Sequence, residues 1–462
     1  MRNPVKYIGI LVLGCLSSSF SYGDDLLSIL QLALDNDPTL RQAQANYREN
    51  RESMIQSRSS LLPSAQLTAS TTRLTSGPSY SIYPSFMDPI TGVTTTRRID
   101  DHSFRPGINN HGWTMGLNQS VVNLANWYTF QSARARDKAT AVSLAAQEQD
   151  LIMRVAAAYF DVLRAIDTVD TNVQEEEAAL RSLEQTRQRE EVGLVAITDV
   201  FDSQAAYDLA QNTTILQRDI LQSRYEALEA ITGQSHPSIE VLRADFPIVQ
   251  VDGELSEWEY EAENSSLAIA AAEYNLEASK KNLKARKSDH LPTVSLSGGY
   301  NHNVTAPIVN QGIQVGGGAF DRTSLALNLT IPIYSGGAVS SRRRAAEYNV
   351  ISAQESLNLT ERQLTQNIRN AYRRVNTDAL VIAQRQQSIT SAQSALDATE
   401  LGAEVGTRNI VEVLRARENL YRALRQYADA RYNYVMDSLT LRQVAGILTP
   451  QDIIDLNEWL QQ

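Results

Sequence analysis

Cysteine is almost absent from the 462 residues, which contain only Cys15. A single cysteine cannot form an intramolecular disulfide, and it leaves no cysteine cluster for a structural zinc site. The five histidines form no His-x-x-x-His pair, and no Gly-x-Ser-x-Gly sequence is present. We therefore expect a protein that is not an enzyme and that binds no metal and no cofactor.

An excess of positive charge is also missing, because the formal net charge is -11. A nucleic-acid partner would need a basic face, so we expect no nucleic-acid binding. Beyond residue 23 the sequence has no apolar run long enough for a transmembrane helix. If the protein spans a membrane, it must do so by strands.

The first 23 residues have the composition of a secretory signal peptide. Two basic residues precede an apolar run over residues 7–16, and small residues end at Gly23. We expect cleavage after Gly23 and export of the mature chain. An alternative interpretation takes residues 12–15 as a lipoprotein box with an acylated Cys15, but Leu13 is bulky for such a box.

One stretch of the sequence occurs twice, at residues 192–200 and again at 405–413. The two glycines in these stretches, Gly193 and Gly406, are 213 positions apart. Each follows a long helical pattern, where glycine is expected in a left-handed C-terminal cap. The repeat therefore predicts two helical hairpins, with their tips at residues 190–199 and 402–411.

Heptad patterns flank both tips. Residues 125–191 contain neither proline nor glycine, and apolar side chains recur every seventh position from Val155 and from Tyr159, a pattern that fades toward the tip. The returning helix has the same spacing from Val200, and a shift of 213 gives a matching series from Val413. A period of 3.5 residues indicates left-handed coiled coils, and about 65 helical residues span roughly 100 Å.

Alternation of apolar and polar residues predicts four strands. These strands cover residues 62–76, 112–123, 292–304 and 322–334, and a polar loop is expected over about 77–111. The clearest alternation is that of Leu325, Leu327, Leu329 and Ile331, which we expect to face lipid.

The predicted elements form two structural repeats, residues 24–235 and 254–446. Each has an initial helix, two strands, a long helix, a tip and a returning helix; the initial helices are expected over about 25–60 and 254–289. Residues 236–253 are a linker, and residues 447–462 form a C-terminal segment. Four strands cannot close a barrel and an open sheet edge is not tolerated in lipid, so several chains must share one barrel.

In order and spacing, these motifs resemble the TolC family of outer-membrane channel-tunnel proteins over nearly all of residues 24–460. The motifs that carry the resemblance are Leu61-Leu62-Pro63, His290-Leu291-Pro292, residues 329–334 with Gly336-Gly337, Val192 through Val200, Val405-Gly406-Thr407-Arg408, residues 430–434, and Ile231-Thr232-Gly233.

The resemblance implies a mixed fold in a homotrimer. It implies a shared 12-stranded β-barrel in the outer membrane of a Gram-negative bacterium, surrounded by outer-membrane lipid and continued by an α-helical coiled-coil tunnel in the periplasm. It further implies export of drugs and secreted proteins. The expected partners are a periplasmic adaptor protein and an inner-membrane efflux pump or ABC secretion transporter.

The resemblance also assigns roles at the tips. It places the closed periplasmic entrance there, with Asp199, beside Thr198, bonded to Arg408 of a neighbouring hairpin. Ala403 stands where the family has a tyrosine, so half of this latch is missing. Two further roles are expected: Glu412 and Arg415 line the pore constriction, and Gly193, Leu194, Gly406 and Thr407 dock the adaptor. Because Arg415 replaces a family carboxylate, cation selectivity is in doubt.

Two alternative functions stay open. The first is an acylated outlet that serves efflux only, and the second is a periplasmic coiled-coil structural or adaptor protein without a pore. The predicted strands argue against the second. Two charge runs have simpler interpretations: residues 175–177 as a solvated helix face, and residues 342–344 as a solvated or headgroup-facing segment.

Overall fold

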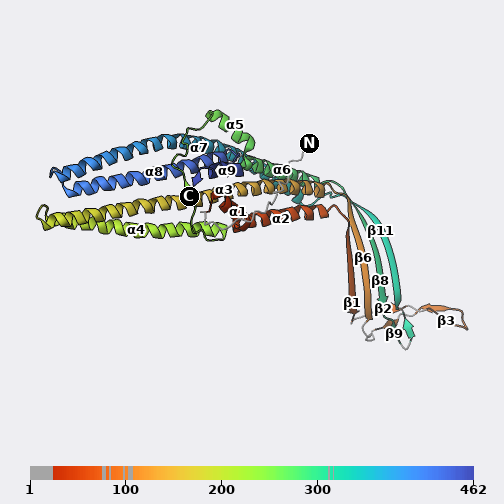
Figure 1. Ribbon diagram of the computed structural model, residues 1–462. Helices are drawn as coiled ribbons and strands as arrows, with labels where there is room; N and C mark the ends of the chain where they lie inside the picture. The colour runs from red at the N-terminus through yellow and green to blue at the C-terminus, as the bar shows by residue number, and fades with distance from the viewer. Residues whose placement is uncertain are drawn as a thin grey trace, which may run out of the picture. The chain divides into compact units, whose positions relative to one another are not determined.

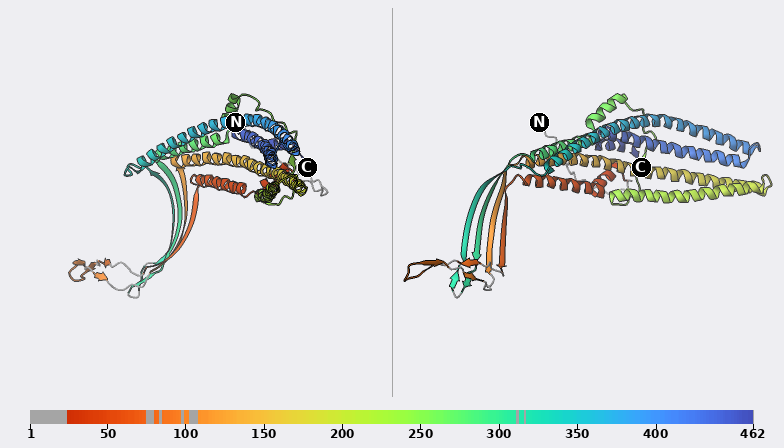
Figure 2. Two further views of the ribbon diagram at one scale, coloured as in Figure 1. Left: turned by 90° about the vertical axis from the view of Figure 1, so that its left-hand side faces the viewer. Right: turned by 180° about the vertical axis from the view of Figure 1, so that it is seen from behind.

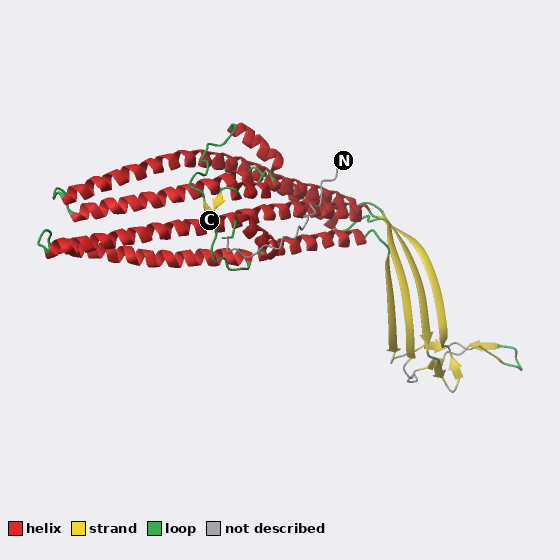
Figure 3. Cartoon of the chain, viewed as in Figure 1, coloured by secondary structure: helices red, strands yellow, loops and turns green. Residues whose placement is uncertain are grey.

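The structure is a computed structural model that describes residues 24–74, 80–82, 85–96, 99–101, 108–310, 313–315 and 317–461. The predicted signal peptide, including Cys15, lies outside these residues. Helices dominate (Figure 3). They are α1 (Leu26–Asn36), α2 (Pro38–Ser59), α3 (Leu124–Glu191), α4 (Ile197–Thr232), α5 (Leu255–Ser265), α6 (Leu267–Ser288), α7 (Ala338–Glu404), α8 (Ile410–Val444) and α9 (Pro450–Asn457).

Four long strands accompany the helices: β1 (Ser64–Leu74), β6 (Ile108–Val122), β8 (Thr293–Thr305) and β11 (Gly318–Thr330). The predicted loop over 77–111 contains short strands where it is described, namely β2 (Tyr80–Ile82) paired with β5 (Ile99–Asp101), and β3 (Ser85–Met87) paired with β4 (Thr94–Thr96). The remaining strands are β7 (Val241–Leu242), β9 (Ile308–Asn310), β10 (Ile313–Val315) and β12 (Leu460–Gln461). None of the described helices is long and apolar enough to cross a membrane.

The chain divides into two compact units that cut across the two sequence repeats. The helical unit comprises Met1–Ala45, Ser143–Ile269 and Thr360–Gln462, and the sheet unit comprises Asn46–Val142 and Ala270–Leu359. The units combine both repeats because strands of the two repeats pair with each other: β6 is hydrogen-bonded to β8.

The sheet unit contains one antiparallel four-stranded sheet in the order β1-β6-β8-β11, whose strands run side by side in every view (Figures 1 and 2). The pairing places Trp113 opposite His302, and His302 opposite Asp321. Because side chains alternate along a strand, this register decides which residues share a face across all four strands.

One face of the sheet is apolar over most of its length and the other is polar. The first face has apolar side chains on all four strands, all of them exposed except the half-buried Leu296, namely Leu67, Trp113, Met115, Leu117, Leu296, Leu325, Leu327 and Leu329. The second has Thr68, Thr114, Asn301 and Asn328, where Asn301 donates to the Thr114 hydroxyl at 2.7 Å. Leu327 and Asn328 therefore lie on opposite faces of the sheet, as the alternation predicts.

Two strands end or begin at other residues than predicted, and a proline explains the difference in each case. The strand expected over 322–334 ends at Thr330, so Ile331 follows the strand instead of belonging to it. Pro332 has no N–H to donate to a ladder, and it restricts the backbone of Ile331. In the same way, the strand expected from residue 62 begins at Ser64, directly after Pro63. Its predicted end, residues 75–76, lies outside the described residues.

Each of the two initial helices is broken once, whereas the sequence predicts one continuous helix in each place. Asp37 interrupts the helix expected over 25–60, and Ser266 interrupts the one expected over 254–289. The two breaks are 229 positions apart, as Pro63 and Pro292 are. Each break residue caps the next helix, because Asp37 accepts from the Leu40 N–H at 2.8 Å and Ser266 from the Ile269 N–H at 3.3 Å.

The core of the helical unit confirms the heptad series. Val155 and Tyr159 are almost fully buried, as are Val413, Leu420 and Leu441 of the second series. A charged group tightens this region: Arg154 donates to the buried Asp37 at 2.8 Å and holds the pKa of that carboxyl below its usual range. Toward the tips, small or polar residues join the buried apolar ones, as at Asn172, Thr186 and Ser203.

A pair of carboxyl groups in the helical unit predicts a pH-dependent stability. Burial and the neighbouring Asp437 raise the pKa of Asp378 to about 6, above the ordinary aspartate value of 3.8. The folded chain therefore holds this proton more tightly than the unfolded chain does. Its contribution to stability is complete below about pH 4 and is lost as the pH rises through about 6.

Asp378→Asn should therefore raise the melting temperature at pH 7.5 and change it little at pH 4.5, because the amide resembles the protonated acid. Thermal unfolding at the two pH values measures this. Asp397→Asn is the control on the same helix, since Asp397 is exposed and accepts from Gln393 at 2.7 Å. An equal gain at both pH values would contradict the assignment.

Candidate functional site: the hairpin tips

The two hairpin tips have the same backbone geometry. Gly193 has φ 75° and Gly406 has φ 78°, so both are in the left-handed conformation predicted for them. The N–H groups that follow return to matching carbonyls: Leu194 donates to Arg189 at 2.8 Å, and Thr407 donates to Gly402 at 2.8 Å. Both tips lie at the same end of the helical unit (Figure 1).

The tips expose apolar side chains. Val192 and Leu194 of the first tip are about two-thirds exposed, and so is Val405 of the second. A Cβ built on Gly193 or Gly406 meets no atom within 4 Å in this chain, so both glycines open toward free space. Thr407 is exposed as well, and its hydroxyl donates to the Gly402 carbonyl at 3.0 Å.

The predicted latch residues lie on separate hairpins. Asp199 is in the first turn of α4, next to the exposed Thr198. Arg408 precedes α8, is 59% exposed, and donates to Glu412 of the same helix at 2.6 Å. The backbone N–H of Glu412 also donates to the Asn409 side chain, which caps α8. The structure therefore brings Arg408 and Glu412 together within one chain, although Glu412 was assigned to the pore and Arg408 to the latch.

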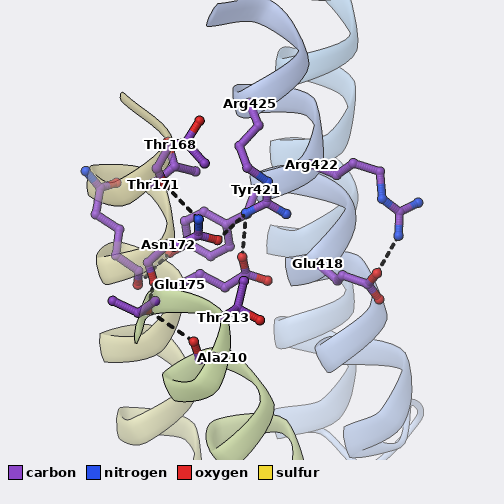
Figure 4. Close-up of polar contacts among 12 residues, drawn as sticks. Thr168, Thr171, Asn172, Glu175, Ala210, Thr213, Glu418, Tyr421, Arg422 and Arg425 are labelled. Atoms are coloured by element: carbon purple, nitrogen blue, oxygen red, sulfur yellow. Dashed lines mark hydrogen bonds and ion pairs between the residues drawn. The ribbon is translucent and has the colours of Figure 1, made fainter. Parts of the chain in front are cut away.

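A cavity of about 310 Å³ lies between α3, α4 and α8 behind the tips. Arg415, predicted at the pore constriction, is among its lining residues and is exposed. Asn172, Glu175 and Arg425 are among its lining residues and belong to a network of polar contacts (Figure 4). Arg425 of α8 donates to Glu175 at 2.6 Å and to the Asn172 side chain at 3.0 Å, and Thr214 of α4 donates to the Asn172 carbonyl at 3.3 Å.

Two further residues, Arg417 and Tyr421, connect α8 to its neighbours. Arg417 donates to the Ala178 carbonyl at 2.8 Å and to Glu400 of α7 at 2.7 Å. Tyr421 donates to the Gln174 carbonyl at 3.1 Å, and burial raises the pKa of its phenol. Together with the network around Arg425, these contacts join both hairpins within one protomer. We call the six residues involved the clasp: Asn172, Glu175, Thr214, Arg417, Tyr421 and Arg425.

The clasp is not predicted from the sequence, and the prediction for one of its members is wrong. Glu175 was interpreted as part of a solvated face, but its side chain is only 20% exposed and is paired with Arg425. A buried amide at a coiled-coil seam position was the available signal, since Asn172 stands one heptad before the buried Ala179. Among the residues that the structure describes, no group of three His, Cys, Asp or Glu side chains is arranged to hold a metal ion.

A family model described as "Outer membrane efflux protein" matches residues 29–234 and 258–447. The chain is 35% identical to the outer membrane protein TolC of Vibrio cholerae serotype O1, with 97% of this chain and 96% of that protein covered. It is 30% identical to TolC of Escherichia coli K12, over 96% of this chain and 87% of that protein. The proteases secretion protein PrtF of Dickeya chrysanthemi is 26% identical over 99% of this chain and 95% of its own length.

Solved structures share the fold at low sequence identity. A crystal structure of CusC aligns with a TM-score of 0.75 and 16% identity, covering 93% of this chain and 95% of that one. The outer membrane protein VceC from Vibrio cholerae aligns with a TM-score of 0.72 and 18% identity, covering 91% of this chain and 96% of that one.

Proposed function

The chain belongs to the outer membrane efflux protein family, and on that basis we propose that three copies form one outer-membrane channel with a periplasmic tunnel, used in efflux and type I secretion. Family members are channel proteins and not enzymes. Family membership and the four-stranded sheet together argue against the pore-less coiled-coil alternative.

The two-faced sheet is the observation that carries this proposal. A β-sheet in a bilayer needs an apolar face toward lipid, and a channel needs a polar face toward water. The register supplies both, with Leu327 and its neighbours on one face and Asn328 and its neighbours on the other. The edge strands β1 and β11 each run for more than ten residues. Open edges of this length would be costly in lipid, and three chains pairing β1 with β11 would remove them.

Engineered disulfides test the shared barrel. Thr68→Cys fixes one side on β1, and single cysteines at even positions from 320 to 328 scan the same polar face of β11. The natural Cys15 lies in the predicted signal peptide, so the mature chain adds no other thiol. We expect at least one pair to give a covalent trimer on oxidation. No cross-link at any pair would reject pairing of these two edges.

The two faces predict opposite tolerance to charge. Leu327→Arg should impair assembly, because an arginine at a mid-membrane lipid-facing position costs roughly 2–4 kcal/mol. Asn328→Arg is the matched control, one residue along the same strand, and should assemble normally because it faces the lumen. The yield of SDS-resistant trimer in unheated samples measures the assembly of both variants. Equal assembly of the two variants would show that the assignment of the faces is wrong.

The partners follow from the same family. Two relatives, PrtF and the alkaline protease secretion protein AprF of Pseudomonas aeruginosa, are named for secretion of proteases. By analogy, we propose that this channel receives its cargo from an inner-membrane efflux pump or an ABC secretion transporter through a periplasmic adaptor. The exposed tip residues Val192, Leu194 and Val405 support the tips as the docking surface. Leu194, Gly193 and Gly406 are the proposed contacts.

The tips are also the proposed gate. Asp199 and Arg408 belong to different hairpins, so an arginine fork from one hairpin can bind a carboxylate of the next chain in a ring. Arg408 would then exchange Glu412 for Asp199, or bind both. Exposed ion pairs contribute only about 0–1 kcal/mol each, so such a latch is weak enough to open. The buried polar side chains of Asn172, Thr186 and Ser203 behind the tips support movement of the hairpins there.

A further inference from the structure

The helical segments that flank the sheet are strongly basic in a chain that is acidic as a whole. These junction helices comprise residues 46–62, 124–142, 270–292 and 335–359, all within the sheet unit. They contain fourteen Lys and Arg residues against eight Asp and Glu residues, a net charge of +6, whereas the full chain has -11. At least six of their bases therefore have no carboxylate of their own within these segments.

The pairing that does occur in the junction helices is loose. Five Lys or Arg contacts with carboxylates there have N–O distances of 3.7–3.9 Å, including Arg342 with Asp289 and Arg343 with Glu347. Some pairs of the helical unit are much closer, since Arg425 lies 2.6 Å from Glu175 and Arg417 lies 2.7 Å from Glu400, while others there, such as Arg374 with Asp437 at 3.9 Å, are equally long. The exposed bases of the junction helices are thus largely available to an outside anion; they include Lys284, Lys287, Arg342, Arg343 and Arg344.

Exposed apolar side chains separate these bases from the sheet at each of the four junctions. Leu62 lies after α2, Trp127 lies in the first turn of α3, Leu291 lies after α6, and Ile333 and Tyr334 precede α7. The bases begin four to eight residues further from the strands, at Arg58, Arg134, Lys287 and Arg342. Between Trp127 and Arg134, which both lie in α3, the rise of 1.5 Å per helical residue gives roughly 10 Å, comparable to the headgroup layer beside the hydrocarbon.

We propose that the junction helices bind the phosphate groups of anionic phospholipids in the inner leaflet of the outer membrane, with Arg342, Arg343 and Arg344 as principal contacts. The proposal rests on the proposed function, which places the sheet in the bilayer and the helices on its periplasmic side. Apolar and aromatic side chains enter the edge of the hydrocarbon, and guanidinium groups reach the phosphates. Anionic phospholipid thereby fixes the depth of the channel in the membrane.

The test uses the full mature trimer in neutral detergent, titrated with phosphatidylglycerol or with phosphatidylcholine and followed by native mass spectrometry. We expect phosphatidylglycerol to bind at least tenfold more tightly. The triple variant Arg342→Gln, Arg343→Gln, Arg344→Gln should lose most of this preference, because each base near an anionic surface contributes about fivefold in affinity. Binding of phosphatidylcholine should not change.

A second triple variant is the control. Arg362→Gln, Arg373→Gln, Arg374→Gln removes three exposed charges from the same helix, α7, outside the junction helices, and should keep the preference. Equal affinity for both lipids, or equal loss in both triple variants, would overturn the proposal. Tighter binding of lipid A than of phosphatidylglycerol would also overturn it, since lipid A belongs to the outer leaflet. Single-channel recording on the same samples separates the two claims: a conducting trimer without lipid preference rejects only this inference.

Discussion

Replacing Gly193 or Gly406 by leucine should abolish export while leaving the trimer intact. Both glycines have φ near 75° and open toward free space, so the substitution adds backbone strain of about 1–2 kcal/mol without a clash inside the chain. A bulky side chain would, however, hold a partner helix away from the tip. Loss of one docking contact of this kind costs about 2 kcal/mol or more, a factor of about 30 in affinity.

Drug resistance of cells that carry each variant measures the effect, and SDS-resistant trimer measures assembly. Gly233→Ala is the strain control, because Gly233 has the same φ of 75° at the other end of α4 and a Cβ there makes only an ordinary contact with Asn36. This control should export normally. Unchanged resistance in both tip variants would exclude the tips as the docking surface.

Arg408→Ala should open the closed channel. The change removes the guanidinium from both Glu412 and the proposed partner Asp199, which leaves two carboxylates to repel each other at the ring of tips. Ala403 cannot supply the second bond that the family tyrosine provides, so the single substitution should raise conductance and vancomycin uptake substantially. Arg415 is the possible substitute, and the double variant Arg408→Ala, Arg415→Ala should open the channel further.

The controls for the latch lie on the same helix. Arg422→Ala removes an exposed partner of Glu418 with the same four-residue spacing, but away from the tip, and should leave conductance unchanged. Arg408→Lys keeps the positive charge but not the planar guanidinium that can donate two hydrogen bonds to one carboxylate, so it should open the channel only partly. If neither the single nor the double alanine variant differs from the wild type, side-chain packing and not charge closes the tips.

Local rules were sufficient to predict much of the fold. The conformation of Gly193 and Gly406 follows from the need for a left-handed residue after a helix, and that requirement does not depend on the rest of the chain. The buried series from Val413 follows from helix periodicity alone. The two faces of β11 follow from strand alternation, and the early end of this strand follows from the local effect of Pro332.

The clasp could not be predicted in this way. Arg425 and Glu175 are 250 positions apart, and their contact depends on where α8 crosses α3. A run of three glutamates gives no indication of which member will meet a partner. The two helix breaks differ in how far the sequence predicts them. Pro38 is a local signal for the break at Asp37. Ser266 has no proline beside it and is recognisable mainly by its position 229 residues after Asp37.

Single-channel recording in planar lipid bilayers tests the central claim most directly. Purified wild-type protein should insert as trimers and give discrete conductance steps, and the double variant Arg408→Ala, Arg415→Ala should give larger ones from the same membrane side. A protein that leaves the bilayer non-conducting in both forms, although it is folded and trimeric, would contradict its assignment as a channel.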